Sequence, residues 1–559
     1  MIKNCLAISL FFCLFASCKK GSDPTMPPVI TPAAPVNLKT ILVNTSSLDN
    51  TVYGVNSTPV IKASFSQPLQ RDSVATAVSM AEEGGAAAPV TTTFENGDST
   101  LVIQPSSPLK YLTKYHFKIS TTLQSAGNGS FTTAVDKDFI TRIDSSFKFP
   151  VLTDNALLDL VEKQTFKYFW DFSHPVSGLA RERSNGDNNI VTSGGSGFGI
   201  MSLITGISRN FITRADGLAK IQLITAFLKN TAQNFKGAFP HWLHGATGVA
   251  IPFSQKDNGA DLVETSYLIQ GLLCARQYFN GADVAETTLR TDINTICDRV
   301  QWDWFRKNNE DVLYWHWSPD YTWDMNHKIQ GWNECLITYI LAASSTTHSI
   351  PASVYTNGWT ASGVNGFING KTYYGYTLPL GPTLGGPLFF SHYSFLGVNP
   401  NGLTDTYANY TTQTKNHTLI NYNYCIANPN NYYGYSDQCW GLTASDIPNG
   451  YNANSPTSDL GVISPTAALS SFPYTPVESM KALKFFYYVL GDKIFKDYGF
   501  VDAFALKDLW YANSFLAIDQ GPIIVMIENY RSNLLWGLLT SCPEVKAGMK
   551  KLGFSAPYL

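Results

Sequence analysis

The chain has 559 residues, and its 39 lysine and arginine residues against 42 aspartate and glutamate residues give a formal net charge of -3 at pH 7. A chain of this length can bury a large core and form more than one domain. Charged residues make up only 14% of the sequence, and there is no basic patch of the kind that binds nucleic acid. Aromatic residues reach 13%, which points weakly toward surfaces on which flat ligands stack.

Residues 1–17 have the pattern of a bacterial lipoprotein signal peptide. Lys3 supplies the positive charge, and the apolar run Leu6–Phe15 is too short to span a bilayer as a mature helix. Small residues precede Cys18, which predicts cleavage before this cysteine and lipidation of its thiol. An ordinary secretory signal cut nearby is the alternative. Residues 18–35 are rich in Pro and indicate a tether, so we expect a protein held in the periplasm or at the outer-membrane surface by its lipid alone.

The remaining cysteines form no metal-binding motif or disulfide framework. Cys274 and Cys335 lie in apolar helical patterns and are expected to be buried thiols. Cys425 and Cys439 flank an irregular segment and are the best candidates for a disulfide.

Residues 36–142 are predicted to form a small all-β sandwich. Apolar and polar residues alternate over 60–69, 91–105 and 114–121, and turn residues such as Asn96–Asp98 separate these runs. The pattern resembles the bacterial Ig-like modules that are attached to surface enzymes. A spacer or stabilising role is favoured over sugar binding, because this region carries no cluster of potential catalytic residues.

Residues 150–559 are predicted to be mainly α-helical. Apolar residues recur at three- and four-residue spacing in eight segments, and strand signals between them are few and short. Serial helices joined by long aromatic loops favour an (α/α)6 barrel over an open solenoid, since no short-period repeat is visible. The eight segments are 156–172, 217–235, 261–279, 285–305, 329–344, 477–492, 503–515 and 521–539.

The segment from Tyr435 to Glu478 is rich in Trp, Tyr, Asp, Gly and Pro and has no steady period. Long irregular segments within a compact domain are often functional. Tyr435 and Trp440 offer faces for sugar rings, and Asp437 and Asp446 offer carboxylates, so the segment indicates a carbohydrate cleft. A structural loop that packs its own aromatic residues is the alternative.

Asp257, Asp261 and Glu264 stand at a predicted helix start. Capping accounts well for the two aspartates. It accounts less well for Glu264, which precedes a densely apolar face and is expected to point into the protein. A carboxyl group in a partly dry pocket has a raised pKa, as a general acid requires. Glu264 is therefore the predicted acid, and Asp446 is preferred over Asp437 as the base.

Further residues are predicted to bind substrate at the rim of the cleft. No HExxH or comparable spacing is present, so the chemistry is expected to need neither a metal ion nor another cofactor. The predicted substrate-binding residues, besides Tyr435 and Trp440, are Arg183, Asp261, Trp317, Trp323, His327, Trp332 and Glu334.

Four motifs carry a family resemblance. The chain resembles the glucoamylase-like helical barrel family, and within it the bacterial endo-β-1,2-glucanases of glycoside hydrolase family 144. The resemblance covers about residues 152–559 and rests on SGGSGFGIMSLITG, GADLVETSYLIQGLLCARQYF, YGYSDQCWGLTASDIPNGY and GVISPTAALSSFPYTPVESMKAL, which occur in this order.

The resemblance implies an (α/α)6 barrel that hydrolyses β-1,2-glucan with inversion and releases sophorose and short sophorooligosaccharides. It does not fix the cleavage mode, and an exo-acting, sophorose-releasing enzyme remains an alternative. A more distant alternative is another glucan hydrolase, or a lyase with the same helical barrel. From a different class, a non-catalytic glycan-binding surface lipoprotein also fits the aromatic residues. We expect a monomer.

Overall fold

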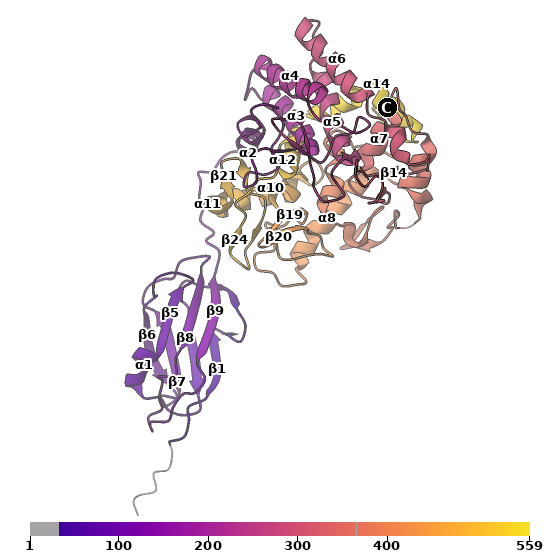
Figure 1. Cartoon of the computed structure of the whole chain (residues 1–559). Helices are drawn as coiled ribbons and strands as arrows, with labels where there is room; N and C mark the ends of the chain where they lie inside the picture. The colour runs from indigo at the N-terminus through magenta and orange to yellow at the C-terminus, as the bar shows by residue number, and fades with distance from the viewer. Residues whose placement is uncertain (1–32, 365) are drawn as a thin grey trace, which may run out of the picture. The chain divides into compact units, whose positions relative to one another are not determined.

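The computed structural model describes residues 33–364 and 366–559. The chain divides into two compact units, of which the first ends at Arg142 and the second runs from Ile143 to Leu559 (Figure 1). The predicted signal peptide, Cys18 and most of the predicted tether lie outside the described residues. In the part of the chain that the structure describes, no helix is both long and apolar enough to cross a membrane.

The N-terminal unit is a sandwich of two sheets, as the alternating sequence predicts. One sheet has the order β2-β1-β4-β7-β6 and the other the order β3-β9-β8-β5, in which only β3 and β9 pair in parallel. Its elements are β1 (Leu38–Val43), β2 (Ser46–Ser47), β3 (Val52–Val55), β4 (Ile61–Phe65), α1 (Arg71–Ala77), β5 (Val78–Glu82), β6 (Val90–Glu95), β7 (Thr100–Pro105), β8 (Lys114–Ile119) and β9 (Val135–Thr141).

Period-two alternation fixes which face of each strand enters this core. Ile61, Ala63 and Phe65 of β4 are buried, whereas the residues between them are half-buried. Residues 96–99 connect β6 to β7, and Asn96, Gly97 and Asp98 have positive φ values of 54°, 62° and 66°. Asn, Gly and Asp are the residues that most readily adopt this conformation in turns.

The second unit is mainly α-helical. Helices α3, α5, α7 and α12 are buried along most of their length, and amphipathic helices such as α4 and α6 cover them. This layering is that of an (α/α)6 barrel (Figure 1). The helices are α2 (Asp154–Trp170), α3 (Ser193–Ser208), α4 (Arg214–Asn230), α5 (Leu262–Tyr278), α6 (Val284–Asp298), α7 (Leu336–Ser344), α8 (Tyr410–Ala427), α9 (Pro465–Leu469), α10 (Pro476–Lys484), α11 (Gly491–Ile494), α12 (Ala517–Ser532), α13 (Leu534–Ser541) and α14 (Pro543–Lys551).

Glycines let α3 and α5 pack with their backbones in contact. A Cβ atom at Gly197 of α3 would lie 2.1 Å from the carbonyl oxygen of Tyr267 in α5, and a Cβ atom at Gly271 would lie 2.2 Å from the carbonyl oxygen of Gly197. No larger residue fits at either position without moving a helix. The glycine run that the sequence places here therefore serves close helix packing.

Short strand pairs and tight helical turns fill the loops between the helices. The strands are β10 (Ile190–Thr192), β11 (Trp242–His244), β12 (Ala250–Ile251), β13 (Ala260–Asp261), β14 (Leu313–Tyr314), β15 (His316–Trp317), β16 (Lys328–Ile329), β17 (Thr372–Tyr373), β18 (Tyr376–Thr377), β19 (Ala444–Ile447), β20 (Gly450–Ala453), β21 (Phe495–Lys496), β22 (Gly499–Phe500), β23 (Phe504–Ala505) and β24 (Trp510–Tyr511). The helical turns are η1 (Trp302–Arg306), η2 (Val354–Trp359), η3 (Ala361–Gly363), η4 (Thr383–Gly385), η5 (Leu388–Ser391), η6 (Ser394–Leu396) and η7 (Phe485–Val489).

One predicted helix is wrong, and helices α3, α8, α9 and α14 lie outside the eight predicted segments. Residues 503–515 form the hairpin β23–β24, with Leu509 at a φ of 51° near the turn. Their apolar spacing suits either a helix or a strand, so the period alone cannot decide. Helix α3 is rich in Gly, and α8 is rich in Thr, Asn and Tyr; none of these residues favours a helix by itself.

The six described cysteines outside the N-terminal segment are all free thiols, and Cys274 and Cys335 are buried as predicted. The candidate disulfide between Cys425 and Cys439 is not formed, although both residues are buried.

A strap that precedes α2 packs on the helical unit. The ring of Phe147 stacks on Tyr488 with their centroids 4.8 Å apart, and the Leu152 amide donates to the Tyr488 hydroxyl over 2.9 Å. The amide of Lys148 donates to the Tyr488 carbonyl oxygen over 2.7 Å. The helical unit therefore begins before residue 150.

We expect a fragment of residues 143–559 to fold by itself, because it holds its own core. A fragment that starts at Thr153 should be less stable by roughly 1–3 kcal/mol, since it lacks the ring stack and two hydrogen bonds. Urea unfolding of both fragments measures the difference. Equal stability would show that the strap contributes nothing, and an unfolded 143–559 fragment would show that the first unit is needed.

Candidate active site

A cavity of about 630 Å³ lies where the N-terminal ends of α3, α5 and α12 meet the β19–β20 hairpin. Its wall contains the carboxyl groups of Glu182, Glu264 and Glu334 together with several aromatic rings. The residues that line the cavity include Glu182, Arg183, Thr192, His241, Trp242, Phe253, Glu264, Trp315, Glu334 and Tyr451.

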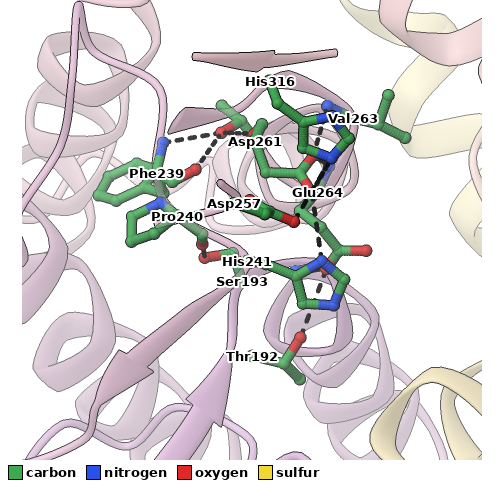
Figure 2. A network of polar contacts seen from close by, with 12 residues as sticks. Thr192, Ser193, Phe239, Pro240, His241, Asp257, Asp261, Val263, Glu264 and His316 are labelled. Carbon is green, nitrogen blue, oxygen red and sulfur yellow. Dashed lines mark hydrogen bonds and ion pairs between the residues drawn. The ribbon is translucent and has the colours of Figure 1, made fainter. Parts of the chain in front are cut away.

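The start of α5 places Glu264 in this wall. Asp261 is the N-cap residue, and its side chain accepts hydrogen bonds from the amides of Val263 at 3.0 Å and Glu264 at 2.9 Å. Asp261 is therefore the capping residue that the sequence suggests. Glu264 does not complete a capping box but turns toward α3 (Figure 2).

Glu264 Oε2 accepts hydrogen bonds from the Gly194 amide at 2.8 Å and from the Thr192 hydroxyl at 3.4 Å. The side chain is buried, and burial raises the pKa of Glu264; the nearby Asp261 carboxylate adds to the rise, while His241 opposes it. A raised pKa keeps this carboxyl group protonated to a higher pH, as a general acid needs.

Glu334 is a second carboxyl group that lines the cavity. It lies just before α7, and burial raises its pKa to about 7. Its main-chain carbonyl accepts hydrogen bonds from the hydroxyls of Ser394 and Tyr267, which fix the backbone there. The sequence predicts Glu334 only as a substrate-binding residue. Its raised pKa makes it a second candidate for the general acid.

Asp446 of β19 is fixed by donors that suit a carboxylate. Arg183 Nη1 lies 3.2 Å from Oδ1 and 3.3 Å from Oδ2, and the Ser514 hydroxyl donates to Oδ2 over 2.5 Å. The Asp446 amide in turn donates to Asp502 over 2.7 Å. Arg183 lies at the cavity and also donates to Glu182 over 3.0 Å, so it joins Glu182 of the cavity wall to Asp446, which is not among the lining residues.

Histidines and aspartates form a polar network beside Glu264 (Figure 2). His241 Nδ1 lies 3.2 Å from Asp261 Oδ2, and His316 Nε2 lies 3.5 Å from Asp257 and 3.7 Å from Asp261. Burial by itself would lower the pKa of His241, but the carboxylates of Glu264 and its neighbours raise it to about 9. Burial raises the pKa of Asp257 to about 7 and lowers that of His316 to about 4.

Two groups among the described residues have the spacing to hold a metal ion. His241, Asp257 and Asp261 each offer a ligand atom within 4.8 Å of the others, and the same is true of a group on the N-terminal unit. That second group is His116, Asp136 and Asp138.

The aromatic residues of the cavity are mostly ones that the sequence does not single out. Phe253 is 50% exposed and stacks on His241 with centroids 4.2 Å apart, and Tyr451 is 49% exposed. Trp242 and Trp315 complete this set of rings. Tyr451 lies in the irregular segment that the sequence predicts to form the cleft, whereas Trp242, Phe253 and Trp315 lie in other loops and short strands.

The predicted stacking residues lie elsewhere. Trp440 is fully buried, and its indole N–H donates to the Glu478 carbonyl oxygen. Trp332 is also buried, and the Tyr435 hydroxyl donates to Asp459 over 2.7 Å. Trp317 and Trp323 pack on Trp304 rather than on the cavity.

Asp437 does not reach the cavity. It lies on the surface, 3.0 Å from Lys481, and about half of its side chain is exposed. The sequence offers both Asp437 and Asp446 as bases and prefers Asp446; the two residues share one irregular segment. His327 lies next to the cavity, since its ring stacks on Trp315 with centroids 5.0 Å apart.

The chain matches two family models. The model described as "Putative glucoamylase" matches residues 326–543, and the model described as "Bacterial Ig-like domain" matches residues 25–141.

One similar solved structure is the endo-β-1,2-glucanase from Chitinophaga pinensis in complex with sophorotriose and glucose. It is 53% identical to this chain, and the match covers 73% of this chain and 100% of that chain with a TM-score of 0.71. A β-1,2-glucanase from Parabacteroides distasonis is 38% identical, covering 93% of this chain and 74% of that chain with a TM-score of 0.70.

A curated relative from Parabacteroides distasonis is an exo β-1,2-glucooligosaccharide sophorohydrolase that acts at the non-reducing end. It is 45% identical over 420 residues, which cover 72% of this chain and 58% of the relative. The matched part of the chain therefore spans little more than half the length of this relative.

The geometry around Glu264 predicts that Gly194 tolerates no side chain. A Cβ atom there would lie 2.4 Å from Glu264 Oε2 and 2.9 Å from the Tyr267 ring. Gly194→Ala should therefore cost about 1–3 kcal/mol of stability, as overpacking usually does. Gly537→Ala is the matched control, because it is helical with open space around it, and it should be neutral or stabilising by up to about 1 kcal/mol. Equal urea midpoints for the two variants would contradict the packing at Glu264.

Proposed function

The chain belongs to the glucoamylase-like family that contains the bacterial β-1,2-glucanases, and on that premise we propose that it is a glycoside hydrolase that cleaves β-1,2-glucan. The observation that carries this proposal is the cavity in which Glu264 and Glu334, two carboxyl groups with raised pKa values, face aromatic rings. Hydrolysis of a glycosidic bond needs one carboxylic acid and one carboxylate, and sugar rings stack on aromatic faces.

In the proposed mechanism Glu264 is the general acid. It donates its proton to the oxygen of the leaving sugar, and its raised pKa lets it hold that proton near neutral pH. The donors to Glu264 Oε2 come from Gly194 and Thr192. They fix the position of the carboxyl group.

Asp446 is the proposed general base. Arg183 and Ser514 fix its side chain, and it takes a proton from water on the opposite face of the sugar ring, with inversion of the anomeric carbon. The chain carries a net charge of only -3, and an uncharged glucan needs no basic groove.

Endo-cleavage, with release of sophorose and short sophorooligosaccharides, is our first choice. The Chitinophaga endo-enzyme is matched over its whole length, whereas only 58% of the exo-acting relative is matched. Exo-cleavage, releasing sophorose from the non-reducing end, is the second candidate, because the 45% identity to that relative favours it. A non-catalytic glycan-binding lipoprotein would keep the aromatic rings but would not need paired acids with raised pKa values.

We also propose that the chain is a monomer that is anchored to the bacterial envelope by a lipid on Cys18. The supporting observation is the sequence around that cysteine, with Lys3 and the apolar run Leu6–Phe15 before it. The mass of the N-terminal peptide of the mature protein tests the anchor, and an unmodified Cys18 would refute it.

Glu264→Gln should lower kcat by about 10²–10⁴ while leaving the fold and substrate binding intact, because positioned proton transfer contributes that much. Wild-type activity should fall as pH rises through the Glu264 pKa, since the acid is then deprotonated, and the variant should lack this alkaline limb. Asp437→Asn is the matched control, because Asp437 pairs with Lys481 away from the cavity. If Glu334→Gln loses activity and Glu264→Gln does not, Glu334 is the acid.

The products from linear β-1,2-glucan test both the substrate and the cleavage mode. Early chromatograms should show sophorooligosaccharides of several lengths, whereas an exo-enzyme gives sophorose alone from the start. Proton NMR should show an initial α-anomer at the new reducing end, because inversion of a β-linkage produces it. An initial β-anomer would refute the mechanism, and the absence of any product from β-1,2-glucan, with laminarin and starch alongside, would refute the function.

A further inference from the structure

Four side chains from three loops converge beside Glu264 without any sequence motif that links them. Asp261 of β13 and His316 of β15 are direct partners in an antiparallel pair. His241 precedes β11, and Asp257 lies four residues before Asp261. Figure 2 shows the imidazole rings and the carboxylates turned toward one another.

His316 is held less closely than in an ordinary hydrogen-bonded cluster, whereas His241 is hydrogen-bonded to Asp261. His316 Nε2 lies 3.5 Å from Asp257 Oδ2 and 3.7 Å from Asp261 Oδ2, beyond the usual 2.7–3.2 Å of an N–H···O bond. His241 Nδ1 lies 3.2 Å from Asp261 Oδ2. Four ligands at about 2.0–2.2 Å from a tetrahedral zinc ion lie about 3.3–3.6 Å from one another. The three distances of 3.2, 3.5 and 3.7 Å lie near this edge length, and the ligand atoms of His241, Asp257 and Asp261 all lie within 4.8 Å of one another.

Two atoms of the cluster are buried and lack a partner. Asp257 is 4% exposed, and its Oδ1 has no hydrogen bond within the described structure; the same holds for Nδ1 of His316, whose side chain is 9% exposed. Buried carboxylates need a cation close by. Among the described residues, the ion pairs of Asp257 and Asp261 are with histidines alone.

The carboxylate of Asp261 is already oriented for a ligand. Its Oδ1 accepts the amides of Val263 and Glu264 at the start of α5, which leaves Oδ2 to face the two histidines. Metal-binding carboxylates are commonly fixed in this way by hydrogen bonds to the other oxygen.

We propose that His241, Asp257, Asp261 and His316 bind one divalent transition-metal ion of the zinc class. Two imidazole nitrogens and two carboxylate oxygens suit Zn²⁺, whereas Ca²⁺ and Mg²⁺ prefer all-oxygen sites with more ligands. The site lies in the wall of the cavity, since His241 lines it. Metal binding there does not depend on the proposed glucanase activity.

The second cluster of the chain provides a control. His116 Nδ1 lies 2.6 Å from Asp138, and Lys114 lies 3.3 Å from the same carboxylate. Lys118 lies 3.0 Å from Asp136, so lysine ammonium groups already neutralise both carboxylates. This cluster is more exposed, and we expect it to bind no ion tightly.

The test is isothermal titration of the full chain, produced without a histidine tag and stripped with EDTA, with Zn²⁺ as the probe. The wild type should bind close to one equivalent. Asp257→Asn and His316→Gln should each weaken binding at least tenfold, and His116→Gln should bind like the wild type. Co²⁺ should give the strong visible absorption of a four-coordinate ion in the wild type only.

Thermal unfolding separates lost ligands from lost structure. Zn²⁺ should raise the melting temperature of the wild type and of His116→Gln, because an ion that binds only the native state stabilises it. The proposal is overturned if the wild type binds no equivalent of Zn²⁺, if Asp257→Asn and His316→Gln bind as tightly as the wild type, or if Ca²⁺ binds and Zn²⁺ does not. Should one variant be unfolded, a six-coordinate Co²⁺ spectrum of the wild type would still overturn the proposed ligand set.

Discussion

The contact between the backbones of α3 and α5 is the constraint on which the site depends. Gly197 and Gly271 bring the two helices so close that any Cβ atom would collide with a main-chain oxygen. This contact places the first turn of α3 against the first turn of α5. The Gly194 amide, which has no partner within its own helix, then donates to Glu264. A helix-packing contact thus fixes a potential catalytic carboxyl group.

Much of the fold could be predicted from the sequence, because the hydrophobic period reports burial directly. The alternation in β4 and the turn at Asn96–Asp98 give the sandwich, and the three- and four-residue spacing gives most helices. The period fails at α3, whose glycines serve packing against α5 rather than helix propensity. It fails again over 503–515, where the same spacing suits both structures and the hairpin prevails.

The site could be predicted only where local structure determines direction. Glu264 follows a capping aspartate, so its place in the first turn is readable from the chain. The direction of a side chain in an irregular loop cannot be predicted in this way. Asp437, for example, lies on the surface rather than at the cavity. Trp440 of the same segment is a second example, because it is completely buried and offers no face to a ligand. Phe253 carries no local signal, since only tertiary contacts between distant loops bring it to the cavity. Tyr451 lies in the segment predicted to form the cleft, but nothing in that segment distinguishes it from the other tyrosines.

Glu264 and Asp446 are held by different donors, and this difference is what acid–base chemistry requires. Neutral amide and hydroxyl groups hold Glu264, and a helix N-terminus stabilises a nearby anion by only about 0.3–2 kcal/mol. Burial of an ion costs several kcal/mol, so burial prevails and the pKa of Glu264 is raised. Asp446 instead accepts hydrogen bonds from the guanidinium group of Arg183, and such charge-assisted bonds are roughly twice as strong as bonds between neutral groups. The cavity wall therefore contains the Glu264 carboxyl group of α5 and Arg183, which donates to the Asp446 carboxyl group of β19.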